Sequence, residues 1–346
     1  MTNAGAGFYA NQLRQELCQR NLRYARGRVH VESYGSPPVV VYAPDEGRHG
    51  NFFDPAYAAI LARPEWLRRF EKVHAQARHS LPKAERRWRE LDSSMSSDAL
   101  LMNIFCTPGV LESAPLLNAL GIEAQPEPDF GWKARVPLAS GRFDRTEVDM
   151  RLGPLLVEAK LTETDFQTRE AEIVESYRDF DVVFERELLP RVPLPPKRRK
   201  EPTEFTEDYS QEFESFVIEP ELRPPLLDAL RAALTLPSSA AGRKVSPAGP
   251  PAYASYQLIR NVLASYALNC SFCVIHDERR PELREAWFQV MAAVKSAAMR
   301  VRLKVLTWQE LAAFLPDELQ AFLDLKYGIV APGRFASPLD GADCVE

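Results

Sequence analysis

The sequence predicts a mixed α/β fold in which a small sheet is flanked by helices. Three observations lead to this prediction: two short strands that meet at Gly153-Pro154, a compact apolar strand at residues 270–276, and helix-length segments around them. Side chains alternate between faces in a strand but repeat about every 3.6 residues in a helix, so the two patterns can be told apart. The 346 residues, 45% of them apolar, suffice for one large or two modest domains.

The N-terminal part, residues 1–92, is predicted to be a helical and partly basic region. Residues 8–26 have the pattern of an amphipathic helix, residues 39–42 form a strand candidate, and residues 54–91 predict two or three helices interrupted at Pro64 and Pro82. This last segment is rich in Lys and Arg and carries interleaved aromatic residues. Such a face could hold nucleic-acid phosphates, and an ordinary solvated helix face over core aromatics is the alternative.

Residues 93–330 are predicted to form the core domain, beginning with a helix and a three-stranded meander. The helix covers residues 96–106, with Ser96 or Ser97 as its N-cap. The strands are expected at 131–138, 144–152 and 155–162. A helix rich in Glu and Arg, which carries Gln167, is expected from residue 165 to about 184.

The second half of this core is interrupted by a Pro-rich, charged insertion at about residues 185–252. Its basic run, Lys197 to Lys200, could touch a phosphate backbone or could be a solvated linker. The expected order then resumes with a helix, a strand, a helix, a strand and a helix at residues 253–267, 270–276, 281–299, 301–306 and 307–314. Thr307 and Glu310 have the spacing of a capping box, and residues 331–346 are predicted to be a flexible tail.

The hairpin around Gly153-Pro154 gathers charges on one face. If the turn is centred between these two residues, Asp149 lies opposite Glu158 and Glu147 lies opposite Lys160. Carboxylates opposite each other destabilise a sheet, but a Mg²⁺ ion would remove that repulsion, since it binds carboxylates together with waters and phosphate oxygens. The lysine could then orient or deprotonate a water. A solvated hairpin face with a Glu-Lys ion pair is the alternative.

Bulk properties narrow the class of protein further. No apolar run reaches membrane-spanning length, and the first residues contain no apolar signal core. The five scattered cysteines suit a reducing cytoplasm, and the net charge of -5 does not indicate a strongly basic nucleic-acid binder. The chain has neither a glycine-rich phosphate loop nor a Gly-x-Ser-x-Gly motif, so nucleotide hydrolysis and serine esterase chemistry lack support.

Asp149, eight intervening residues and then Glu158-Ala-Lys160 resemble the PD-(D/E)XK signature of the restriction endonuclease-like nucleases. The predicted order of helix, three-strand meander, helix and strand resembles the core of that superfamily, with an extra C-terminal strand and helices. The stretches Tyr256-Gln-Leu-Ile-Arg-Asn261 and Leu306-Thr-Trp-Gln-Glu310 are similar to a group of bacterial proteins regarded as restriction endonucleases.

The resemblance implies a metal-dependent DNA endonuclease of restriction or defence type. It implies that Asp149 and Glu158 bind Mg²⁺, with Mn²⁺ as an alternative ion, and that Lys160 helps to activate the attacking water. Double-stranded DNA would be the partner, and a homodimer is compatible with the family. A catalytically silent module of the same fold, which binds DNA or protein, is the alternative.

The resemblance also implies residues that support this site. The family often adds a carboxylate on its first helix, but Asp98 lies at the start of that helix and Glu112 beyond its end, so Glu147 is the substitute. The family's polar residue after the third strand would be Gln257, with Gln167 as a competitor. Arg260 is the matching candidate for a phosphate contact. The expected site residues are therefore Asp149, Glu158, Lys160, Glu147, Gln257, Arg260 and Gln167.

Overall fold

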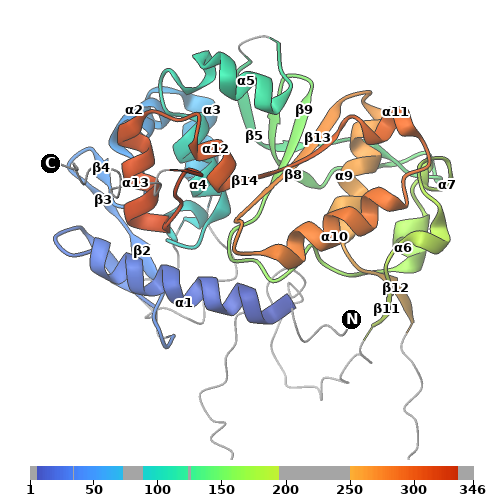
Figure 1. Ribbon diagram of the computed structural model, residues 1–346, viewed down its shortest axis with the longest axis horizontal. Coiled ribbons are helices and arrows are strands. Elements are labelled where there is room, and N and C mark those ends of the chain that lie inside the picture. Colours follow the sequence, from blue (N-terminus) through green and yellow to red (C-terminus); the bar gives the residue numbers. More distant parts are fainter. Residues whose placement is uncertain (1–5, 34, 73–88, 124–125, 195–249, 334–346) are drawn as a thin grey trace, which may run out of the picture.

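A five-stranded mixed sheet forms the centre of the protein in the computed structural model, with helices on both faces (Figure 1). The structure describes residues 6–33, 35–72, 89–123, 126–194 and 250–333. Its strands follow the order β14-β13-β9-β8-β5. The bounds of these strands are β5 Pro128–Lys133, β8 Glu147–Leu152, β9 Leu155–Ala159, β13 Ser271–His276 and β14 Leu303–Thr307.

The remaining elements surround this sheet. The helices are α1 Ala6–Tyr24, α2 Asp54–Ala62, α3 Pro64–Phe70, α4 Ser97–Phe105, α5 Ala114–Leu120, α6 Ala171–Glu175, α7 Phe180–Val183, α9 Tyr256–Ala267, α10 Pro281–Ala292, α11 Ala297–Arg300, α12 Trp308–Ala312 and α13 Asp317–Tyr327. The short strands are β1 His30–Glu32, β2 Val40–Tyr42, β3 Pro44–Asp45, β4 Arg48–His49, β6 Val136–Pro137, β7 Phe143–Asp144, β10 Arg169–Glu170, β11 Arg191–Pro193 and β12 Pro251–Tyr253. None of the helices in the described ranges combines the length and apolarity that a membrane span requires.

The predicted meander is confirmed, and its register near the turn is the predicted one. β8 pairs antiparallel with β9 through Met150–Val157, Arg151–Leu156 and Leu152–Leu155. Gly153 has a φ of 57°, a left-handed conformation that suits glycine in a tight turn. The ladder ends at Met150–Val157, so the predicted pairs of Asp149 with Glu158 and of Glu147 with Lys160 are not part of it.

Two hydrophobic clusters cover the two faces of the sheet, because the strands alternate between them. In β9 and β13, Val157 and Ile275 belong to the cluster that contains side chains of α1, α4, α12 and α13. Leu156 and Val274 belong to the other cluster, with side chains of α9 and α10. All five residues of β9 are buried, so this strand lies in the middle of the core with both faces covered.

The N-terminal region contains the predicted helices and strand and packs on the same core. Leu13 and Leu17 of α1 are buried in the cluster that also holds Leu323 of α13. The predicted strand at residues 39–42 is β2, which pairs with β1. Of the helices predicted over residues 54–91, α2 and α3 are present, and residues 73–88 lie outside the described part of the chain.

The first predicted strand, 131–138, is wrong in its bounds. β5 begins earlier, at Pro128, and ends at Lys133, while residues 136–137 pair with β7 in a separate two-stranded sheet. Proline cannot donate to a ladder, so Pro128 gives no sequence signal for the start of a strand. β5 is the edge strand, where a proline at the first position is tolerated.

The long helix predicted from residue 165 to 184 is also wrong. Gln167 lies in a loop with a φ of 62°, residues 169–170 pair with β12, and only the short helices α6 and α7 follow. The carbonyls of Phe166 and Gln167 accept hydrogen bonds from the N–H groups of Gln257 and Tyr256 at the start of α9. These long-range contacts override the local helix propensity of the segment.

The helix predicted over 281–299 is divided into α10 and α11. Between them Val294 bridges Phe184, and Lys295 N–H donates to the carbonyl of Val183, so the chain is extended there. Ser296 then caps α11. The predicted capping box of Thr307 and Glu310 is confirmed at α12.

The ends of the predicted insertion lie side by side. β11 and β12 pair antiparallel, with Pro193 opposite Pro251, and Leu194 N–H donates to the carbonyl of Pro250. Residues 195–249, which include the basic run Lys197 to Lys200, lie outside the described residues, as do 334–346 of the predicted tail. The insertion therefore begins and ends at one edge of the fold.

We expect Leu17→Ala to lower the free energy of unfolding by about 2–5 kcal/mol, because Leu17 is fully buried between α1 and the core. Chemical denaturation of the full chain measures this change. Gln15→Ala, at an exposed position of the same helix, is the control and should change stability by less than about 0.5 kcal/mol. A Leu17→Ala protein as stable as this control would show that α1 does not belong to the core.

Candidate functional site

The candidate site lies where β8 and β9 separate. Asp149 immediately precedes Met150, the residue of β8 at which pairing with β9 ends. Its Oδ2 accepts a hydrogen bond from the N–H of Ala159 at 2.7 Å. A side-chain carboxylate therefore replaces a backbone acceptor between the two strands. This holds Asp149 next to Glu158 and Lys160, which flank Ala159 in the chain.

Glu158 is buried, with 1% of its surface exposed, and both of its carboxylate oxygens accept hydrogen bonds. Oε1 accepts from Lys160 Nζ at 2.7 Å, and Oε2 accepts from Asn261 Nδ2 at 2.8 Å. Burial of this ion pair contradicts the alternative of a solvated hairpin face, because a solvated Glu-Lys pair would be exposed. Glu158 and Lys160, on the charged face of the hairpin, are thus part of the interior.

Lys160 is held by its backbone on both sides. Its N–H donates to the carbonyl of Ile275 at 2.8 Å, and its carbonyl accepts from Trp308 Nε1 at 2.9 Å. Burial alone would lower the pKa of Lys160, but Glu158 and Asp149 raise it above its usual value. The ammonium group therefore stays charged and fixed beside the two carboxylates.

The negative charge of Asp149 is unfavourable in this site. Its side chain is partly buried, and burial raises its pKa well above the usual value, as do the neighbouring charges of Glu158 and Asp98. Lys160 and the N–H of Ala159 oppose this rise without cancelling it. Without a further cation the site favours a protonated Asp149, which is the state expected when carboxylates crowd together.

Asp98 and Glu147 form ion pairs with basic side chains of α3 and of the residues just after it. Arg69 donates to Asp98 and, at 3.2 Å, to Glu147. Lys72 Nζ lies 3.0 Å from the same Glu147 carboxylate. Glu147 is thus turned toward Arg69 and Lys72, whereas Asp98, which sequence reasoning set aside, lies in the electrostatic range of Asp149.

Helix α9 contributes two neighbouring residues to this region. Arg260 donates from Nη2 to the carbonyl of Glu147 and to Asn261 Oδ1, each at 2.8 Å. Its Nε and Nη1 are buried with no hydrogen-bond partner among the described residues. Gln257 lies one turn earlier on α9, on the side of Arg260 and Asn261. Its competitor Gln167 lies in the loop before β10.

Sequence reasoning missed three residues of this constellation. Asn261 was visible only as a polar residue in a helix, Asp98 was judged too near the helix start, and Arg69 was one of many bases in the N-terminal region. Asn261 is fully buried, and a buried amide needs hydrogen-bond partners. In the sequence, the one signal that Asn261 belongs to the site was its position next to Arg260. Nothing in the spacing of Arg69 points to the hairpin.

The carboxylates of Asp149 and Glu158 are hard oxygen donors of the kind that Mg²⁺ takes, together with waters and phosphate oxygens. The described residues include no group of three or more His, Cys, Asp or Glu side chains arranged around one metal position. The fit to an ion therefore rests on these two carboxylates and on the crowded charge of Asp149.

Neither cysteine of the Cys270-x-x-Cys273 motif is in a disulfide.

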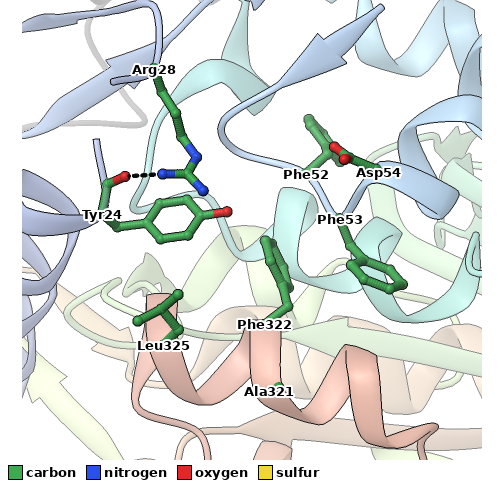
Figure 2. A pocket seen from close by; sticks show the side chains of 8 residues that line it. All are labelled: Tyr24, Arg28, Phe52, Phe53, Asp54, Ala321, Phe322 and Leu325. Atoms are coloured by element: carbon green, nitrogen blue, oxygen red, sulfur yellow. Dashed lines mark hydrogen bonds between the residues drawn. The ribbon is translucent and has the colours of Figure 1, made fainter. Parts of the chain in front are cut away.

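The aromatic pocket that Figure 2 shows is a separate feature. It lies between the end of α1, the start of α2 and α13, with Tyr24, Phe53 and Phe322 among its walls and a volume of about 280 Å³. None of the site residues described above lines this pocket.

Comparison with known proteins identifies a family. A family model described as restriction endonuclease associating with ARP matches residues 11–328, from α1 to the glycine that ends α13. No curated protein and no solved structure matches the chain. The match covers the N-terminal region, the sheet and the site together.

We expect Asp149→Asn to stabilise the metal-free protein, by on the order of 1 kcal/mol, because it removes a charge that the fold disfavours while its amide oxygen can still accept from Ala159. The raised pKa gives the sign: the stability cost of ionised Asp149 is absent in acid and grows as the pH rises toward that pKa. Thermal unfolding in a chelator, at pH 5 and pH 8, measures it. Asp129→Asn, exposed on β5, is the control, and equal melting temperatures for both variants would contradict the assignment.

Proposed function

The chain belongs to the family of restriction endonucleases associating with ARP, and on this premise we propose that it is a Mg²⁺-dependent endonuclease of the PD-(D/E)XK type that cleaves double-stranded DNA. The family membership supports the general part of this proposal, a nuclease that acts on DNA. The order of meander, α9 and β13 and the arrangement of Asp149, Glu158 and Lys160 support the finer part.

The observation that carries the proposal is the crowding of Asp149. Its carboxylate accepts the N–H of Ala159, next to Glu158 in the chain, and its pKa is raised by burial first and then by the negative charges of Glu158 and Asp98. Natural proteins tolerate such an arrangement where function requires it. A divalent cation is the ligand that would neutralise it.

Each residue has a defined part in the proposed reaction. Asp149 and Glu158 would hold Mg²⁺, which supplies Lewis acidity toward a phosphodiester and its attacking water. Lys160 is fixed by Trp308 and Ile275, so its ammonium can orient that water and balance the charge that develops at phosphorus. Asn261 keeps the Glu158 carboxylate in place through its 2.8 Å hydrogen bond.

Arg260 is the candidate contact for a DNA phosphate. Two of its guanidinium nitrogens are buried without a partner among the described residues, although buried polar groups normally have one. A phosphate oxygen would supply the missing acceptor, and arginine matches phosphate geometry well, but Arg260 is only 2% exposed, so neighbouring side chains would have to move for DNA to reach it. Gln257, one turn earlier on α9, is a neighbouring polar candidate for the same role.

The proposal extends to compartment and partners. Cys18, Cys106, Cys270 and Cys273 are all free thiols, which supports a reducing cytoplasm. The association with ARP that the family description states is carried to this chain as part of the proposal. A homodimer, which would place two sites on the two strands of DNA, stays a prediction.

A catalytically silent DNA-binding module of the same fold is the second candidate. It is favoured by the hydrogen bonds of Glu158, since both of its oxygens are already satisfied within the protein. Titration with Mn²⁺ separates the two candidates, because a silent module should bind the ion poorly. Binding that depends on Asp149 supports the nuclease.

We expect Asp149→Ala and Lys160→Ala to reduce cleavage of plasmid DNA in Mg²⁺ by about 100-fold or more, because each removes a group that acts on the reacting phosphate. Lys295→Ala, on the surface, is the control. Lys160→Ala leaves Glu158 buried and unpaired, so Glu158→Gln/Lys160→Met is the better-folded counterpart, and it should be equally inactive. Cleavage at the wild-type rate by folded Asp149→Ala, Lys160→Ala or Glu158→Gln/Lys160→Met protein would overturn the proposed function.

We expect Asn261→Ala to lower the cleavage rate or the metal affinity by about 10- to 100-fold, since it removes the donor that orients Glu158. Calorimetric titration with Mn²⁺ and plasmid cleavage measure the two effects. Asn11→Ala, exposed on α1, serves as the control substitution. An Asn261→Ala protein with unchanged metal affinity and rate would show that Glu158 does not need this contact.

A further inference from the structure

Arg69 of α3 lies among the carboxylates of the site although it is far from them in the sequence. It donates to Asp98 and to Glu147, and its side chain is only 9% exposed. Burial would lower the pKa of Arg69, but Asp98, Glu90, Glu147 and Asp149 outweigh it and raise the pKa above its usual value. A permanent positive charge is therefore enclosed beside Asp149.

The sheet leaves room for this guanidinium at Gly131 of β5. A Cβ atom at residue 131 would lie 3.0 Å from Nη1 of Arg69, and the φ of 65° is one that only glycine adopts readily. Glycine inside a strand often marks the close approach of another group. α3 supplies the arginine, and the glycine of β5 leaves space for its guanidinium.

The charges of the site divide into two sets. Lys160 pairs with Glu158, while Arg69 pairs with Asp98 and Glu147. Asp149 lies between the sets and interacts with the charges of both. Two carboxylates that could otherwise help to hold a second divalent ion are therefore occupied by the guanidinium of Arg69, with Lys72 as a further partner of Glu147.

We propose that Arg69 is a positioning residue that takes the place of a second divalent cation, holding Asp98 and Glu147 beside Asp149 so that the site binds one ion through Asp149 and Glu158. This inference rests on the proposed function. The planar fork of arginine can bind two carboxylates at once in fixed directions, which the point charge of lysine does less well. The N-terminal region would then complete the site.

Titration of the full-length chain with Mn²⁺, without DNA, tests the count of ions. The wild type should bind one ion at Asp149 and Glu158. Arg69→Met alone leaves Glu147 paired with Lys72, so Arg69→Met/Lys72→Met, which frees both Asp98 and Glu147, should bind a second ion, whereas Arg68→Met/Lys72→Met, changed at the exposed neighbouring position, should still bind one. Two ions in the wild type, or one in a folded Arg69→Met/Lys72→Met protein, would overturn the inference.

Stability provides a second measurement. In a chelator Arg69→Met should melt at a lower temperature than Arg68→Met, and Asp98→Asn in the same chain should restore part of the loss, because the two charges balance each other. If Arg69→Met does not fold, the double variant and Arg69→Lys carry the test. Equal melting of Arg69→Met with and without Asp98→Asn counts against the inference.

Activity is the third measurement and separates this inference from the proposed function. Arg69→Met and Arg69→Lys should cleave plasmid about 10- to 100-fold more slowly at saturating Mg²⁺, as expected for a residue that orients ligands. A faster Arg69→Met enzyme would mean that Arg69 blocks the site and would overturn the inference. A wild type that binds one ion but never cleaves DNA would overturn the proposed function alone, since the ion count of the variants still decides the role of Arg69.

Discussion

The buried ion pair of Glu158 and Lys160 is the interaction on which the centre of this protein depends. Enclosing two charges is costly unless each is hydrogen-bonded, and removing one partner of such a pair is far more costly than keeping both. α9 supplies Asn261 to the carboxylate, while Trp308 and β13 fix the backbone of Lys160. Helices and strands from distant parts of the chain are therefore tied to the two residues of this pair, which are separated by one position.

The sequence predicted the parts of the fold that local patterns encode. The meander, the turn at Gly153, the apolar strand β13 and the capping box of Thr307 all follow from alternation, glycine conformation or cap spacing, and all are present. Where tertiary contacts compete with local preference the prediction was wrong. Residues 165–170 became a loop and a short strand because they pair with α9 and β12.

For the site, the sequence predicted which residues of the hairpin lie together but not what surrounds them. The alternation of Asp149, Glu158 and Lys160 was readable because strand periodicity is local. Arg69 reaches Glu147 across 78 positions and Asn261 reaches Glu158 across 103 positions, at separations that no local pattern encodes. Asp98 was set aside because a helix start seemed too remote, whereas α4 begins beside the point where β8 and β9 part.

The paired strands β11 and β12 have a consequence for how the chain can change. Since Pro193 lies opposite Pro251, the two ends of the connection between them are already held together by the fold. The entropy of closing a connection grows only with the logarithm of its length, by about 0.6 kcal/mol for each doubling. For any flexible segment joined between Leu194 and Pro250, a change in length would therefore alter the closure entropy only slightly, because β11 and β12 bring its two ends together.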